Sequence, residues 1–121
     1  MYKVIVAGTR TFNDYSRLKR EIDDFLKETY VFGAPITIVS GGARGADKLG
    51  ERYAKENDYL VEVHPADWDR HGKRAGYIRN KEMAEVANAL IAFWDGKSRG
   101  TRMMIELARS HGLDVRVVNV A

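Results

Sequence analysis

Short apolar runs and amphipathic stretches alternate along the chain. Runs rich in Val, Ile, Leu and Ala, typical of strands buried on both faces, lie at residues 4–7, 36–39, 59–63, 89–93 and 115–118. Between them, apolar side chains recur every three or four positions, as on one face of a helix, over residues 18–29, 46–54, 78–87 and 101–110. The sequence therefore predicts strands and helices in alternation, beginning and ending with a strand.

This alternation predicts an α/β fold class, a single Rossmann-like doubly wound sheet of about five parallel strands flanked by helices. Parallel strands joined by right-handed helical crossovers place helices on both faces of the sheet. No internal repeat, low-complexity stretch or interdomain linker interrupts the pattern. We therefore expect residues 1–121 to form a single domain.

The connection between the third predicted strand and the third predicted helix is longer than the others. Residues 64–75, HPADWDRHGKRA, are mostly polar, and the pattern predicts a loop there before the third helix. Long loops in compact folds are often functional. Within this one, Trp68 either stacks on the base of a ligand or packs the loop onto the domain.

Three loops at the carboxyl ends of predicted strands have a similar composition. GTRT (8–11), SGGARGAD (40–47) and GKSRGT (96–101) each combine glycine with hydroxyl groups and a cationic side chain. Ligands of open α/β sheets bind at this edge, and two of the loops run directly into a helix, whose unpaired N–H groups favour an anion. The pattern predicts phosphate binding by Gly8, Thr9, Arg10, Ser40, Gly41, Gly42, Arg44, Gly45, Ala46, Asp47, Gly96, Ser98, Gly100 and Thr101, together with Arg79 from the third helix.

The roles of three of the side chains are left open by the sequence. Asp47, in the first turn of the second helix, either complements the helix dipole and caps N–H groups or binds ribose hydroxyls. Arg79 follows apolar Ile78 at the border of the core, where its planar fork can reach an anion. Trp94, beside the third loop, is expected to be a pocket wall or an oligomer contact, with packing against the domain as the safer alternative.

Composition limits the kinds of ligand and cofactor that we expect. The formal net charge of +3 and the pI near 9.2 suit an anionic ligand but are modest for a protein that wraps duplex nucleic acid. The chain has no cysteine and three histidines at no ligand-like spacing, which predicts no metal site. We expect no required cofactor, with a divalent cation only as a counter-ion of the ligand.

The absence of cysteine, as suits a reducing compartment, predicts a cytoplasmic protein, and hydropathy predicts no membrane contact. No apolar run approaches the length that spans a bilayer, and Met1-Tyr2-Lys3 leads straight into a predicted strand, with no signal peptide visible.

Four motifs occur in the order in which the SLOG superfamily carries them, namely GTRTF (8–12), SGGARGAD (40–47), IRNKEM (78–83) and GKSRGT (96–101). The chain resembles the small YspA-like branch of that superfamily, whose relatives include the LOG phosphoribohydrolases and the DNA-processing protein DprA. The resemblance implies a Rossmann-like domain that binds a nucleotide or nucleotide-derived ligand at the carboxyl edge of its sheet. It also implies a homo-oligomer, since SLOG relatives commonly pair through helices.

The resemblance extends to single residues. Gly41, Gly42 and Gly45 match the family's first phosphate loop, Gly100 and Thr101 match its second, and Arg79 with Lys81 resembles the arginine-lysine segment of LOG enzymes. The glutamate that LOG enzymes carry three residues after the Gly-Thr threonine falls on Met104. The nearest glutamate is Glu106, two residues further on, which departs from the LOG pattern.

Three functions remain open. The first is nucleotide-ligand binding by a sensor, a sequestering module or an enzyme acting on that ligand. The second is a LOG-like phosphoribohydrolase, which hydrolyses the N-glycosidic bond of a nucleoside 5'-monophosphate, with Arg79, Glu106 and Asp47 as catalytic candidates. The third is DprA-like binding of single-stranded DNA, which the modest charge and the scarcity of aromatic residues outside the predicted core disfavour.

Overall fold

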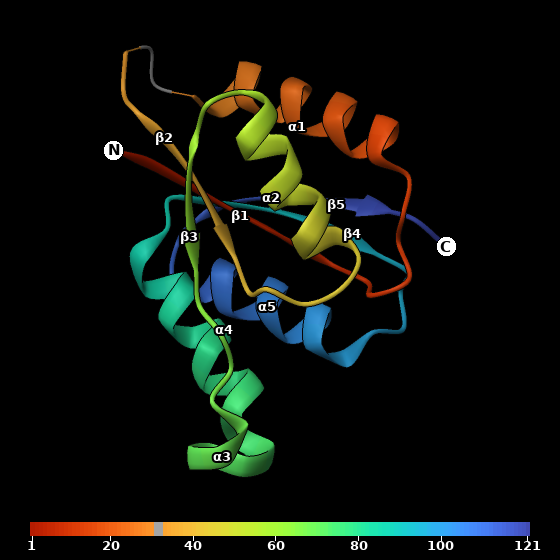
Figure 1. Ribbon diagram of the computed structural model, residues 1–121, viewed down its shortest axis with the longest axis vertical. Helices are drawn as coiled ribbons and strands as arrows, with labels where there is room; N and C mark the ends of the chain where they lie inside the picture. Colours follow the sequence, from red (N-terminus) through yellow and green to blue (C-terminus); the bar gives the residue numbers. More distant parts are fainter. Residues whose placement is uncertain (31–32) are drawn as a thin grey trace.

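A five-stranded parallel sheet runs through the centre of the molecule in a computed structural model that describes residues 1–30 and 33–121 (Figure 1). The strands are β1 (Tyr2–Gly8), β2 (Ile36–Ser40), β3 (Leu60–Val63), β4 (Ala89–Trp94) and β5 (Asp114–Asn119). The helices are α1 (Tyr15–Thr29), α2 (Ala46–Glu56), α3 (Trp68–His71), the 3₁₀ turn η1 (Gly72–Arg74), α4 (Ala75–Val86) and α5 (Arg99–Ser110). The predicted fold class and strand count are confirmed.

The strand order β3-β2-β1-β4-β5 places β1 at the centre of the sheet. The chain builds outward from β1 through β2 to β3, then returns to the other side of β1 for β4 and β5. The order therefore reverses between β1 and β4, which pair in parallel from Val4↔Ala89 to Gly8↔Phe93. Such a switch point leaves a crevice at the carboxyl ends of the two strands.

Alternate residues of each strand face different helices, because strand side chains point to opposite faces in turn. On β1, Val4 and Val6 belong to one core cluster with residues of α1 and α2. Ile5 and Ala7 belong to a second cluster with residues of α4 and α5. Two helices thus cover each face (Figure 1), as the apolar runs of the central strands predict.

Residues 64–75 differ from the predicted loop, because they contain α3 and η1. The side chain of Asp67 accepts a hydrogen bond from the Arg70 amide at 3.0 Å and so caps the start of α3. Gly72 ends α3 with φ +56°, and the third predicted helix then begins three residues early, at Ala75. The pattern missed α3 because a single turn is too short to show helical periodicity.

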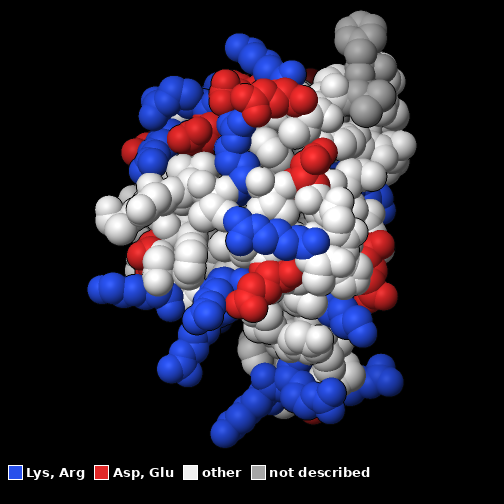
Figure 2. All heavy atoms as spheres, turned by 180° about the vertical axis from the view of Figure 1, so that it is seen from behind, with Lys and Arg blue, Asp and Glu red and all other residues white. Residues whose placement is uncertain are grey.

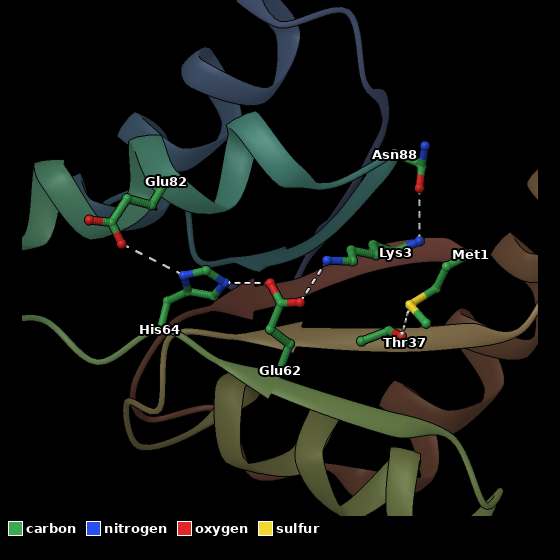
Figure 3. A network of polar contacts seen from close by, with 7 residues as sticks. All are labelled: Met1, Lys3, Thr37, Glu62, His64, Glu82 and Asn88. Atoms are coloured by element: carbon green, nitrogen blue, oxygen red, sulfur yellow. Dashed lines mark hydrogen bonds and ion pairs between the residues drawn. The ribbon is translucent and has the colours of Figure 1, made fainter.

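A polar network ties the edge strand β3 to its neighbours (Figure 3). Glu62 of β3 pairs with Lys3 of β1 at 2.7 Å and with Nε2 of His64 at 2.6 Å. The other ring nitrogen of His64 lies 3.7 Å from a carboxylate oxygen of Glu82 on α4. The network thus ties β3 to α4, the helix that carries Arg79, and gives Glu62 a structural role.

No helix in the described ranges is long and apolar enough to cross a membrane.

The close packing of α2 on β1 makes a testable prediction. A methyl group added at Gly50 would lie 2.7 Å from Cβ and Cγ1 of Val6, a fully buried residue. We expect Gly50→Ala to lower the free energy of unfolding by about 1–3 kcal/mol in urea denaturation, since overpacking forces the backbone apart. The matched control is Gly100→Ala in α5, where no atom lies within 4 Å of the added methyl group. This control should not destabilise the protein, and a Gly50→Ala effect below about 0.5 kcal/mol would contradict the prediction.

Candidate functional site

A cleft of about 390 Å³ lies where the order of the strands reverses. It is formed by the loops that follow β1, β2 and β4 and by residues of α2, α4 and α5. Its lining residues are Ala7, Gly8, Thr9, Arg10, Thr11, Ala43, Asp47, Arg79, Asn80, Met83, Asp95, Ser98, Gly100, Thr101 and Met104. Segments from all three predicted loops therefore meet at one site.

Two glycines allow the loops to approach this closely. A methyl group added at Gly45, which has φ +77°, would lie 2.4 Å from the carbonyl oxygen of Thr9. A methyl group at Gly8 would lie 2.3 Å from the carbonyl oxygen of Phe93. These glycines therefore make room for neighbouring backbone, whereas the sequence had suggested room for a phosphate.

Gly41 makes room for two charged side chains. A methyl group there would lie 2.8 Å from Nη1 of Arg79 and 2.9 Å from Oδ2 of Asp47. Nη1 of Arg79 donates a hydrogen bond to the Gly41 carbonyl at 2.8 Å. The loop after β2 thus fixes an arginine that comes from α4, on the other face of the sheet from α2.

The same arginine continues a hydrogen-bond chain across the cleft. Nε of Arg79 donates to Oδ1 of Asn80 at 2.9 Å, and Nδ2 of Asn80 donates to the carbonyl of Gly100 at 3.3 Å. Asn80 is buried and lines the cleft. The sequence suggested only an interruption between Arg79 and Lys81, but Asn80 joins the loop after β2 to the start of α5.

The first turns of α2 and α5 differ from that of α1 in their side-chain capping. The side chain of Asp14 caps α1 by accepting from the Arg17 amide at 3.1 Å. Within the described residues, no side-chain hydrogen bond caps α2 or α5; Ser98 at the start of α5 instead shares a hydrogen bond of 3.1 Å with Thr101. The first amides of α5 therefore lack a side-chain acceptor beside the cleft, an arrangement that favours an anion.

Burial shifts the pKa values of two charged side chains in the cleft, those of Asp47 and Arg79. Asp47 is 6% exposed, and burial raises its pKa to about 6 against the opposing effects of the Ala43 amide and the Arg79 charge. Burial also lowers the pKa of Arg79, which the Asp47 charge raises and the nearby Arg10 charge lowers. Two guanidinium groups, from Arg10 and Arg79, thus line the cleft together with the Asp47 carboxyl, and both can pair with a bound anion.

Asp95 shapes the loop after β4. Its Oδ1 accepts hydrogen bonds of 2.8 Å from the amides of both Lys97 and Ser98, which lower its pKa. Its own amide donates to Oγ1 of Thr9 at 3.1 Å, so this loop is also tied to the loop after β1. Asp95 follows a predicted strand at the carboxyl edge of the sheet, and this position could have identified it as a residue of the cleft.

The structure places the predicted contacts in three groups. Those that line the cleft are Gly8, Thr9, Arg10, Asp47, Arg79, Ser98, Gly100 and Thr101. Those that line a second, adjacent cavity are Gly41, Gly42 and Arg44. Those found in the lining of neither are Ser40, Gly45, Ala46 and Gly96; the first three are packed within the loops, and Gly96 makes a turn with φ +82°.

Glu106, the third catalytic candidate, lies outside the cleft. It is exposed on α5, lines a separate surface groove, and pairs with Arg102 at 3.2 Å. Met104, at the position of the LOG glutamate, is buried against the cleft instead. Residues two positions apart on a helix point in nearly opposite directions, so Glu106 does not replace the missing carboxylate.

The two tryptophans have different environments. Trp94 packs against the core cluster beneath α4 and α5, and its Nε1 donates to the Ser98 carbonyl at 3.0 Å, so it supports the third loop. It is not among the residues that line the cleft, so of the expected alternatives the structure shows packing and not a pocket wall. Trp68 is 54% exposed and borders the second cavity. No cluster of three metal-binding side chains occurs in residues 1–30 and 33–121.

The fold and the position of the cleft define a Rossmann-like α/β protein with its site at the switch point. The chain belongs to the YspA, cpYpsA-related SLOG family, whose model matches residues 2–71. The predicted superfamily and branch are therefore confirmed. The match ends before Arg79, Asp95 and the start of α5, so half of the cleft comes from residues beyond it.

Relatives extend the comparison over the whole chain. The Gene 61 protein of Mycobacterium phage D29 is 36% identical over 121 residues, covering 95% of this chain and 94% of that protein. DNA processing protein A (DprA) from Streptococcus pneumoniae superimposes with a TM-score of 0.77 at 20% identity, covering all of this chain and 51% of the DprA chain. A protein named TM1055 superimposes with a TM-score of 0.66 at 20% identity, covering 95% of this chain and 72% of that one. The two solved structures support the fold.

The raised pKa of Asp47 predicts a pH dependence of stability. Because the folded protein holds this proton more tightly than the unfolded chain, the contribution of Asp47 to the free energy of unfolding falls as pH rises from about 4 to about 6. We expect wild type to lose roughly 2–3 kcal/mol relative to Asp47→Asn across that range. Urea denaturation of both proteins between pH 4 and pH 7 measures the difference, which also cancels the titration of other carboxyl groups. An equal difference at both ends of the range would contradict the assignment.

Proposed function

We propose that the cleft binds the phosphate and sugar of a nucleotide or nucleotide-derived ligand. The observation that carries the proposal is the uncapped start of α5, which opens on the same cleft as Arg10 and Arg79. Backbone amides at a helix start and forked guanidinium groups are both suited to phosphate oxygens. The open space at Gly100 leaves room for an anion to approach the helix.

Other polar groups that line the cleft suit the sugar. Asp47 and Asn80 line it together with Thr9 and Thr101, and carboxylate and amide oxygens accept hydrogen bonds from ribose hydroxyls. Such an arrangement binds a ligand that carries both a phosphate and a diol. It suits a sensor, a sequestering module or an enzyme.

Binding is tested with the full chain by thermal unfolding and by calorimetric titration against a library of nucleoside phosphates. A ligand present at one hundred times its dissociation constant should stabilise the protein by about 2.7 kcal/mol. We expect Arg10→Gln, a change at an exposed residue of the cleft, to weaken binding about tenfold or more. The matched control is Arg102→Gln, an exposed residue of α5 outside the cleft lining, which should bind as wild type does. A library with no stabilising member would reject the proposal.

A second candidate is hydrolysis of the N-glycosidic bond of a nucleoside 5'-monophosphate. The favouring observation is Asp47, a buried carboxyl with a pKa of about 6 in the same cleft as Arg79. A carboxyl with this pKa is mostly ionised at neutral pH and is suited to accept a proton from the water that replaces the base.

This candidate predicts that incubation with AMP releases adenine, which chromatography detects. Asp47→Asn should reduce the release at least a hundredfold while AMP binding persists, because the amide keeps the shape of the carboxyl but cannot act as a base. Binding of AMP without release of adenine by wild type would leave the binding proposal standing and reject the hydrolase.

A further inference from the structure

A second cavity adjoins the cleft. It has a volume of about 530 Å³ and is lined by Arg10, Gly41, Gly42, Ala43, Arg44, Lys48, Val63, Pro65, Ala66, Trp68 and Arg79. Arg10, Ala43 and Arg79 line both cavities, so the two compartments share a wall. Each volume lies within the roughly 300–1,000 Å³ of ordinary small-molecule sites.

The charges of the two compartments differ. The second cavity has four cationic side chains, from Arg10, Arg44, Lys48 and Arg79, and its described lining contains no carboxylate. The cleft shares two of these cations but also contains Asp47 and Asp95. An anionic group in the second cavity therefore faces four cations and no lining carboxylate, although Lys48 already pairs with Glu51 at 3.6 Å.

An aromatic surface completes the second cavity. Trp68 lies at the start of α3, which Asp67 caps, and Cη2 of its ring would lie 3.6 Å from a methyl group added at Gly76 of α4. The ring is thus supported by α4 and still 54% exposed. Lys and Arg side chains gather on the end of the molecule that α3 and η1 form (Figure 2), including Arg70, Lys73 and Arg74. An exposed indole amid positive charge suits a base that carries a phosphate.

We propose that the ligand has two nucleotide parts joined through phosphate, a linear dinucleotide in its simplest form. The terminal phosphate and its sugar lie in the cleft. The linking phosphate passes Arg10 and Arg79 toward Arg44 and Lys48, and the second base stacks on Trp68. This inference rests on the proposed function, since it assigns the substrate class of the same site.

The experiment compares AMP with the 5'-phosphorylated dinucleotide pApA by calorimetric titration of the full chain at one fixed ionic strength. We expect pApA to bind at least tenfold more tightly than AMP. Lys48→Gln and Trp68→Ala should each remove most of this advantage while AMP binds within about twofold of its wild-type affinity. The matched control for Lys48 is Lys55→Gln, an exposed change on α2 outside both linings, which should keep the advantage.

Each other outcome overturns the inference. Equal affinity for AMP and pApA would show that the second cavity takes no part of the ligand. Equal weakening of AMP and pApA by Trp68→Ala would show that one nucleotide spans both compartments. Affinity that keeps rising from pApA to a hexanucleotide would identify a nucleic-acid strand as the ligand. In the first two cases the proposed function stands. In the third, binding of single-stranded nucleic acid replaces it, and binding of neither AMP nor pApA, with no positive result in the wider library, rejects both proposals.

Discussion

The cleft depends on one close contact between backbones, that of Gly45 with Thr9 and Arg10. At this point the loop after β2 lies against the loop after β1 with no space for a side chain. The contact sets the start of α2, and with it Asp47, beside the loop that carries Arg10. The hydrogen bond from Asp95 to Thr9 then adds the loop after β4 to the same assembly. A larger residue in place of Gly45 would separate the loop after β2 from the other two.

The strands, most helices and the edge of the sheet that carries the site could be predicted from the sequence. Apolar runs and helical spacing are local signals that predict strands and helices. Because ligands of such sheets bind where parallel strands end at one edge, the loops after those strands are then predicted to form the site.

The roles of individual glycines could not be predicted. Gly41 accommodates Arg79, which is 38 positions away along the chain. Gly45 accommodates the backbone of another loop. The local sequence does not reveal which distant residues a glycine contacts. The interpretation of these glycines as phosphate contacts therefore missed the protein groups that they accommodate.

The two residues that sequence reasoning missed share one property: each makes a hydrogen bond to a residue far away in the sequence. Asn80 connects Arg79 to Gly100, and Asp95 connects the loop after β4 to Thr9. Neither residue belongs to a glycine-rich motif. Glu106 shows the opposite error, because its nearness in sequence to the LOG position suggested a role that the turn of α5 excludes. Residues two positions apart point about 200° apart around a helix, so α5 buries Met104 and exposes Glu106.

The pairing of β1 with β4 also determines when the site can exist. These strands adjoin in space but are separated in the described sequence by β2, β3, four α-helices and the 3₁₀ turn η1. A nascent chain on the ribosome that has emerged only through β3 has Thr9, Arg10 and Asp47 but lacks the wall that Arg79, Asp95 and α5 supply. Contacts of such large sequence separation are slow to form. The cleft therefore assembles only after β4 and α5 have joined the half of the sheet that begins with β1.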